Sequence, residues 1–284
     1  MTFKYIDTHT HLNLSVFNDD LAEVLVRTKD AEVAHINIGT TPKDSKKAVE
    51  IAEVNDGSWA IVGLHPVQVA VSDGLAEGVM GEMKVEPKRF DADFYRTLAK
   101  SQKVVGIGEC GYDYFHTSME DFAEQEEAFI AQIALANELN LPLMIHTRNP
   151  NPKENGVSPT GRSVYEDAFL TLKQYAKVPG NIHFYAGTYE EAKKFFDIGF
   201  TVSFTGVITF APVYEEVVKA VPLDLMHAET DSPFVAPVPH RGKRNEPSFV
   251  IEVVKKIAAI KGLKEEEVRE QLLANAEQLY GIEV

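Results

Sequence analysis

Short apolar runs alternate with amphipathic helix patterns along the chain, and this alternation constrains the fold more strongly than any other feature. The apolar runs predict eight strands, at residues 3–8, 34–39, 59–63, 104–108, 141–145, 181–185, 200–204 and 225–228. Apolar residues at three- and four-residue spacing predict helices at 19–30, 41–55, 91–101, 119–140, 161–176, 189–198, 212–221, 247–260 and 264–279. Alternating strands and helices form parallel β/α units, and eight units favour a (β/α)8 barrel of the TIM type.

The length of 284 residues is compatible with one or two domains, but a barrel of this size is one unit. We therefore expect a single α/β domain over residues 1–284. A doubly wound open sheet is the alternative, although it would collect functional residues around one crevice rather than from strands one, four, five, six and eight. Two long loops, at 72–88 and 149–161, are expected to lie over the barrel mouth and shape substrate access; the alternative is that they are tolerated insertions.

Side chains that can bind a metal stand at the C-terminal ends of five predicted strands. His9 and His11 lie two residues apart after the first strand, so they point to the same face and can chelate one ion. A lone histidine is more often structural, but independent accidents would not place such groups at the same end of successive strands. We therefore predict a divalent-metal site. Its candidate ligands are His9, His11, Glu109, His146, His183 and Asp231.

The acidic composition limits the possible partners. A formal net charge of −15 argues against a protein that coats nucleic acid through a basic surface. Bound divalent ions would still make the pocket attractive to phosphate. The single cysteine, Cys110, excludes intrachain disulfides and a cysteine-based zinc site; we expect it to pack as a small apolar residue, with a reactive thiol as the alternative. We find no secretory or membrane segment, so we expect a cytoplasmic protein with no obligate protein partner.

Seven short motifs occur in an order that matches a known family. They lie at 7–12 (Asp-Thr-His-Thr-His-Leu), 63–66, 106–114, 145–148, 183–187, 229–234 and 239–247. In these motifs the chain resembles the TatD family of metal-dependent deoxyribonucleases, within the amidohydrolase-like group of metal barrels. The resemblance extends from the first strand to the last helices. One motif departs from the family pattern, because Ala186 stands where a hydroxyl residue is usual, and this puts substrate contacts rather than the metal site in doubt.

The resemblance implies two divalent metal ions, of Mg, Mn or Zn. His9 and His11 would hold one ion together with Asp231, and Glu109 would bridge both ions without the carbamylated lysine that many related barrels use. We interpret Asp231 as the general base that orients and deprotonates the attacking water, with a plain ligand as the alternative. The ligands of the second ion would be His146 and His183.

Further residues are candidates for substrate contacts. We interpret His65 as a donor to a substrate phosphate, with a structural histidine as the alternative. Arg148 has the fork geometry that suits a phosphate, unless it pairs with a nearby acid. A basic loop after the last strand is expected to contact a polyanion rather than serve only as a solvated loop; its cations are Arg241, Lys243 and Arg244. Aromatic residues that would stack an unpaired base, or else pack at the rim, are Tyr112, Tyr114 and Phe115.

These features together predict a divalent-metal-dependent hydrolase that cleaves phosphodiester bonds of DNA by a metal-activated water. A barrel mouth is too narrow for intact duplex, so we expect exonucleolytic or single-strand action on DNA or an oligonucleotide. The resemblance supplies the substrate, whereas the residues themselves indicate only hydrolysis. One alternative is a hydrolase of a small amide, ester or lactone, since the same ions can polarise a carbonyl. A second is a catalytically idle metal-binding adaptor, although the intact ligand set argues against it.

Overall fold

The computed structural model describes residues 3–69, 89–117, 119–151 and 158–284. Within them, eight strands form one parallel sheet, and neighbouring strands pair in chain order from β1 to β8. This order confirms the predicted (β/α)8 barrel. The strands are β1 (Tyr5–Thr10), β2 (Val33–Ile38), β3 (Ser58–Val62), β4 (Val104–Asp113), β5 (Leu143–Arg148), β6 (Gly180–Ile182), β7 (Phe200–Phe204) and β8 (Met226–Ala228).

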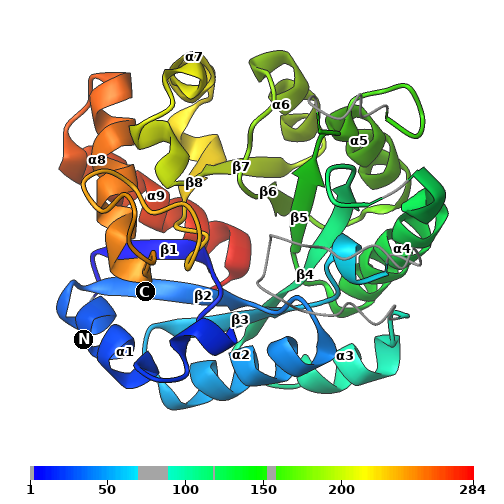
Figure 1. The fold of residues 1–284 in the computed structure, drawn as a ribbon, viewed down its shortest axis with the longest axis horizontal. Coiled ribbons are helices and arrows are strands. Elements are labelled where there is room, and N and C mark those ends of the chain that lie inside the picture. The colour runs from blue at the N-terminus through cyan, green and yellow to red at the C-terminus, as the bar shows by residue number, and fades with distance from the viewer. Residues whose placement is uncertain (1–2, 70–88, 118, 152–157) are drawn as a thin grey trace.

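Helices follow one another round the strands in chain order (Figure 1). Several begin at side chains that cap the free N–H groups: Thr41 accepts from Asp44 with Pro42 at the first turn, and Thr188 and Glu191 form a capping box. Each cap of this kind contributes about 0.5–2 kcal/mol. The helices are α1 (Leu21–Asp30), α2 (Pro42–Val54), α3 (Ala92–Leu98), α4 (Phe122–Leu139), α5 (Val164–Tyr175), α6 (Tyr189–Phe196), α7 (Glu215–Ala220), α8 (Val250–Lys261) and α9 (Glu265–Tyr280).

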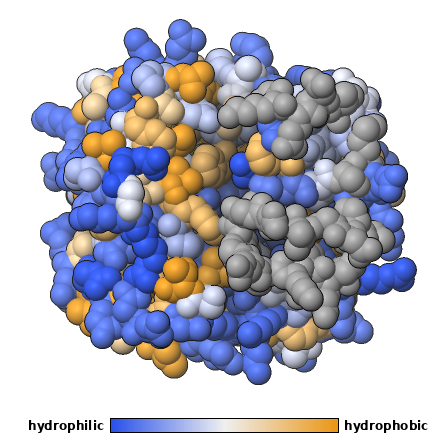
Figure 2. Space-filling view, viewed as in Figure 1, coloured by the Kyte–Doolittle hydropathy of each residue, from blue (hydrophilic) through white to orange (hydrophobic). Residues whose placement is uncertain are grey.

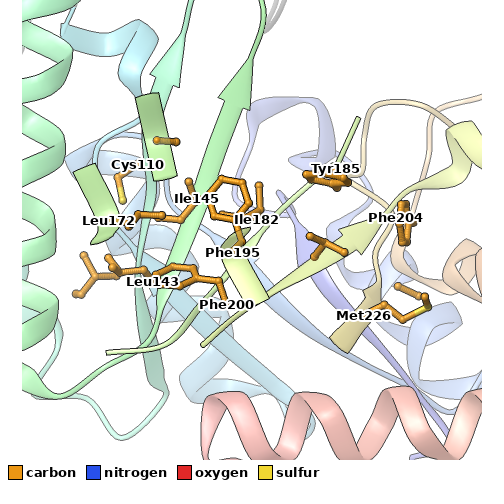
Figure 3. Packing of buried hydrophobic residues seen from close by; sticks show 14 of the residues in the cluster. Cys110, Leu143, Ile145, Leu172, Ile182, Tyr185, Phe195, Phe200, Phe204 and Met226 are labelled. Carbon is orange, nitrogen blue, oxygen red and sulfur yellow. The ribbon is translucent and has the colours of Figure 1, made fainter. Parts of the chain in front are cut away.

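Hydrophobic side chains fill the layer between the strands and the surrounding helices. Figure 3 shows Ile145 of β5 and Ile182 of β6 in the same cluster as Leu172 of α5 and Phe195 of α6. Burying each such side chain contributes roughly 1.5–3 kcal/mol. Alternate residues of the early strands point the other way, into a second cluster with α9 that includes Ile36. The barrel interior is therefore packed, and functional side chains are left to its rim.

The segment after β8 closes the barrel against β1. Thr10 forms a parallel bridge with Ser232, and the N–H of His11 donates to the Ser232 carbonyl at 2.8 Å. One residue earlier, the N–H of Asp231 donates to the His9 carbonyl at 2.9 Å. Closure therefore brings together two motifs that lie at opposite ends of the sequence.

β4 ends at Asp113, so the predicted end at residue 108 is wrong. The added residues pair with β5, where Gly111 lies opposite His146. Gly111 has a φ of +137°, and a Cβ there would come within 2.1 Å of the His146 carbonyl oxygen. Glycine thus allows the two strands to remain paired beyond Glu109, which lies inside the strand rather than at its end.

The loop expected at 72–88 lies outside the described residues, and so do residues 152–157 of the loop expected at 149–161. In the described part of the second loop, the Asn149 side chain accepts the N–H of Val164 at 3.0 Å, at the start of α5. Among the helices that the structure describes, none is both long enough and apolar enough to cross a membrane.

Candidate metal centre

The predicted ligands converge at one rim of the barrel. They come from the C-terminal parts of β1, β4 and β5 and from the segments after β1, β6 and β8, and in a parallel barrel these positions meet at one face. Their side chains are at most 12% exposed. The structure thus brings together His9, His11, Glu109, His146, His183 and Asp231.

Glu109 lies between two groups of nitrogen donors. Its Oε2 lies 3.4 Å from Nε2 of His9 and 3.8 Å from Nε2 of His11. Its Oε1 lies 2.9 Å from Nδ1 of His146 and 2.7 Å from Nε2 of His183. Although burial raises the pKa of Glu109, the surrounding histidines hold it well below its usual range. The carboxylate therefore presents one oxygen to each group.

The first group consists of His9, His11, Asp231 and the Oε2 of Glu109. The two Nε2 atoms lie 3.1 Å apart, and Oδ1 of Asp231 lies 3.7 Å from the first and 3.3 Å from the second. Zinc bonds of about 2.0–2.2 Å in a tetrahedron place ligand atoms roughly 3.3–3.6 Å apart. The observed spacing of 3.1–3.8 Å therefore suits one divalent ion.

The second group consists of His146, His183 and the Oε1 of Glu109. Nδ1 of His146 and Nε2 of His183 lie 3.2 Å apart. Since the carboxylate contacts are 2.7 and 2.9 Å, a bound ion would move these donors apart slightly. The side chains nevertheless supply three converging donors of types that divalent ions accept.

Oxygen atoms on the far side of three rings indicate which nitrogen faces each group: His11 and His146 form hydrogen bonds there, and His183 lies near a carboxylate without a hydrogen bond. Nδ1 of His11 contacts the Ile38 carbonyl at 3.0 Å, so it carries the proton and leaves Nε2 free to bind an ion. Nδ1 of His183 faces Glu229 at 3.4 Å, and Nε2 of His146 contacts Asp113 at 3.0 Å. Acceptors of this kind set both the tautomer and the direction of a ligating ring.

Sequence reasoning gave no role to Asp113 or Glu229. Strand alternation could have indicated Asp113, because residues 109, 111 and 113 of one strand share a face. Asp113 therefore lies on the same face as the predicted ligand Glu109. Glu229 stands two residues before Asp231 and is fully buried. Its carboxylate also accepts the N–H of Phe184 at 2.7 Å and the hydroxyl of Ser203 at 2.6 Å.

The turn that carries Asp231 is held by a buried acid of β1. Asp7 accepts the backbone N–H of Thr230 at 2.8 Å and its hydroxyl at 2.5 Å. Asp231 itself has a φ of +54°, a left-handed conformation that aspartate tolerates better than most residues. The first residue of the Asp-Thr-His-Thr-His motif therefore positions the backbone beside the last predicted ligand.

His65 lies beside the second group, with Nε2 3.5 Å from Oε1 of Glu109. It is close enough to Glu109 and His146 to be considered a ligand. However, its Nδ1 accepts the N–H of Val67 at 3.1 Å, so in the neutral ring Nε2 carries the proton and donates. Burial lowers the pKa of His65, which favours this neutral form. The geometry favours a hydrogen-bond donor at the rim over a metal ligand.

The predicted phosphate-binding cations differ in their surroundings. Arg148 is exposed, with its guanidinium 4.3 Å from the ring centre of Phe115, and Lys243 is also exposed. Arg241 stacks at 3.8 Å over Phe210.

Figure 2 shows hydrophobic residues gathered left of centre on the displayed face, where Figure 1 draws the segments after β7 and β8.

Arg244 is engaged by another part of the chain. Its two terminal nitrogens donate to the carboxylate of Asp20 at 2.8 and 2.6 Å, and the guanidinium lies 4.4 Å from the ring centre of Phe17. Its donors are therefore less available to a substrate than those of Lys243.

The predicted base-stacking role is wrong for two of the three aromatic residues. Tyr112 is fully buried and its hydroxyl contacts that of Thr171 at 2.9 Å. Tyr114 is 7% exposed and donates to Asp167 at 2.9 Å. Because β4 continues past Glu109 to Asp113, alternation turns the ring of Tyr112 away from the ligands and toward the helices. Tyr114, one residue beyond the strand, packs on the same side through its contact with Asp167 of α5. Phe115, beyond the strand, is half-buried under Arg148.

Comparison with known proteins agrees with this geometry. A family model described as TatD related DNase matches residues 6–281. The chain is 36% identical to the uncharacterized metal-dependent hydrolase YabD of Bacillus subtilis, over 97% of this chain and 98% of that protein. It is 29% identical to the 3'-5' ssDNA/RNA exonuclease TatD of Klebsiella pneumoniae, over 98% of each.

A solved structure supports the fold. The crystal structure of YJJV, a TatD homologue from Escherichia coli K12, matches with a TM-score of 0.81 and 23% identity over 100% of both chains. Together with the family match and the clusters of histidines and carboxylates able to bind metal, these findings show that the chain belongs to the TatD family of metal-dependent hydrolases.

Proposed function

We propose that the chain is a deoxyribonuclease that hydrolyses phosphodiester bonds with two divalent ions. The observation that carries this proposal is the position of Glu109, whose two oxygens face separate groups of histidines. His9, His11 and Asp231 would hold one ion, and the ligands of the other would be His146 and His183. Two-ion sites of this kind suit the in-line displacement of a phosphodiester.

The donor set narrows the choice of metal. Imidazole nitrogens suit Zn and accept Mn, whereas Mg prefers oxygen ligands and retains more water. We therefore propose Zn or Mn ahead of Mg. Bound ions would supply charge neutralisation for the phosphate and lower the pKa of an attacking water.

The chain's own groups then complete the reaction. Asp231 takes the proton of the attacking water, because its carboxylate lies at the edge of the first group and is its most exposed member. His65 donates its Nε2 proton in a hydrogen bond to a phosphate oxygen, since its other nitrogen is occupied by Val67. Arg148 presents guanidinium edges to a neighbouring phosphate while its face packs on Phe115.

We propose that single strands or strand ends are the substrate. A phosphodiester inside a duplex cannot reach a buried rim without fraying. The name of the Klebsiella relative, a 3'-5' ssDNA/RNA exonuclease, supports the same choice. Arg241 and Lys243 would neutralise phosphates beyond the scissile one.

The experiment is an assay of metal-stripped protein with Mg, Mn, Zn or Co and oligonucleotides of defined ends and strandedness. We expect shortened products from single strands or frayed ends with at least one ion. Turnover of amide, ester or lactone substrates, but of no phosphodiester, would favour the small-molecule hydrolase. Metal binding without turnover of any substrate, including a chromogenic phosphodiester, would favour the adaptor.

The loop after β8 gives a prediction about substrate length. Replacing Arg241 and Lys243 together by alanine should raise KM for an oligonucleotide several-fold at low salt and leave a small chromogenic phosphodiester unaffected. Each lost phosphate contact should reduce the slope of log KM against log salt by about 0.7. Adding Arg244→Ala should have a smaller effect on KM, because that side chain is paired with Asp20.

The matched control removes two cations from the opposite end of the barrel. Lys29 precedes β2 and Lys177 precedes β6, and both are exposed. Replacing them by alanine changes the net charge equally and should leave KM for the oligonucleotide near that of the wild type. Equal losses on both substrates at every salt concentration, in the Arg241 and Lys243 variant, would mean that the loop only shapes the pocket.

A further inference from the structure

A buried carboxylate outside the predicted ligand set contacts one of its histidines. Asp113 is 1% exposed, and its Oδ2 lies 3.0 Å from Nε2 of His146. The same oxygen lies 2.9 Å from Nδ1 of His116. One carboxylate oxygen therefore faces a nitrogen of each of two imidazole rings.

The other oxygen of Asp113 fixes the carboxylate in place. Oδ1 accepts the backbone N–H groups of Phe115 at 2.9 Å and of His116 at 2.8 Å, which forms a tight turn at the end of β4. The two oxygens therefore have separate tasks. One holds the turn, and the other faces two imidazole nitrogens.

We propose that Asp113 is the positioning residue that makes His146 bind the second ion through Nδ1. An acceptor at Nε2 keeps the proton on that nitrogen and leaves the Nδ1 lone pair directed at Oε1 of Glu109 and Nε2 of His183. Asp113 does not touch the reacting atoms in this role. The inference rests on the proposed two-ion function and adds the residue on which the second ion depends.

The variant Asp113→Asn tests this role selectively. Its carbonyl oxygen can still accept both backbone N–H groups, so the turn survives, but an NH2 group then faces two rings that need an acceptor. Calorimetric titration of the metal-stripped protein with Zn should show one of two sites losing about 10- to 100-fold in affinity relative to the wild type. The other site should keep its affinity.

A second buried carboxylate supplies the control. Asp167 of α5 is 3% exposed and accepts from Tyr114 at 2.9 Å and from Nε of Arg162 at 2.6 Å. The variant Asp167→Asn makes the same chemical change and should lower the melting temperature without changing either Zn affinity. Circular dichroism of both variants checks that each is folded.

A measurement on the wild type removes any dependence on the variants. Nitrogen-15 NMR of the Zn-loaded protein should show His146 protonated at Nε2 and bound to the ion through Nδ1. Binding through Nε2, or unchanged Zn affinities in a folded Asp113→Asn variant, would overturn the inference alone. A wild type that binds one ion would instead overturn the two-ion function on which it rests.

Discussion

Replacing Asp231 by asparagine is expected to lower kcat on a chromogenic phosphodiester by at least about 10²-fold, the lower range for loss of a general base. Asparagine keeps the shape and one oxygen near His9 and His11, which lie 3.7 and 3.3 Å from the carboxylate. It cannot accept the proton of an attacking water. Circular dichroism should show an intact fold, and elemental analysis should find at least one bound ion.

The variant Asp231→Ala separates the role of base from that of ligand. It removes the oxygen that faces the first group, so its ion content should fall as well as its activity. If asparagine already loses the ion of the first group, Asp231 acts as a ligand, and its role as base is not needed to explain the loss. Wild-type turnover by the asparagine variant would remove Asp231 from the mechanism.

Replacing Glu109 by alanine is expected to remove the second ion and to lower activity by about 10²- to 10³-fold, which corresponds to several kcal/mol of lost charge stabilisation. The carboxylate contacts donors of both groups, so its loss affects two ions rather than one. It also removes the carboxylate that five histidines share. The ion content per chain, measured by elemental analysis, should fall below that of the wild type.

The variant Glu109→Gln tests bridging more directly. Glutamine has nearly the same shape but only one oxygen, so it can face one group of histidines and not both. We expect it to bind one ion per chain. Two ions per chain in either variant would show that Glu109 is not the bridge.

The end of β4 could not be predicted from the local sequence pattern. Its apolar run ends at residue 108, which made Glu109 appear to stand at a strand end. The strand continues because Gly111 allows close pairing with β5. This continuation determines on which side of the sheet the side chains of Asp113 and Tyr112 lie. Alternation from Glu109 would have placed Asp113 with the ligands and Tyr112 with the helices, but only if the strand was known to continue.

The basic loop illustrates a different limit. Arg241, Lys243 and Arg244 form one cluster in the sequence, yet in the fold they have different surroundings. Asp20 lies 224 positions from Arg244, so no local pattern could pair them. Which cations remain available to a substrate is therefore a property of the folded protein.

By itself, the sequence determined the order of the eight strands and the positions of the candidate ligands, because parallel β/α units bring the C-terminal ends of all strands to one rim. The tertiary structure alone decided which oxygen of Glu109 faces which histidines and which nitrogen of His146 faces inward. Those choices depend on side-chain rotation and on hydrogen bonds between residues far apart in the sequence, such as Asp113 to His146. Strand periodicity fixes the side of the sheet from which a side chain leaves, but it does not fix the direction in which its ring or carboxylate turns.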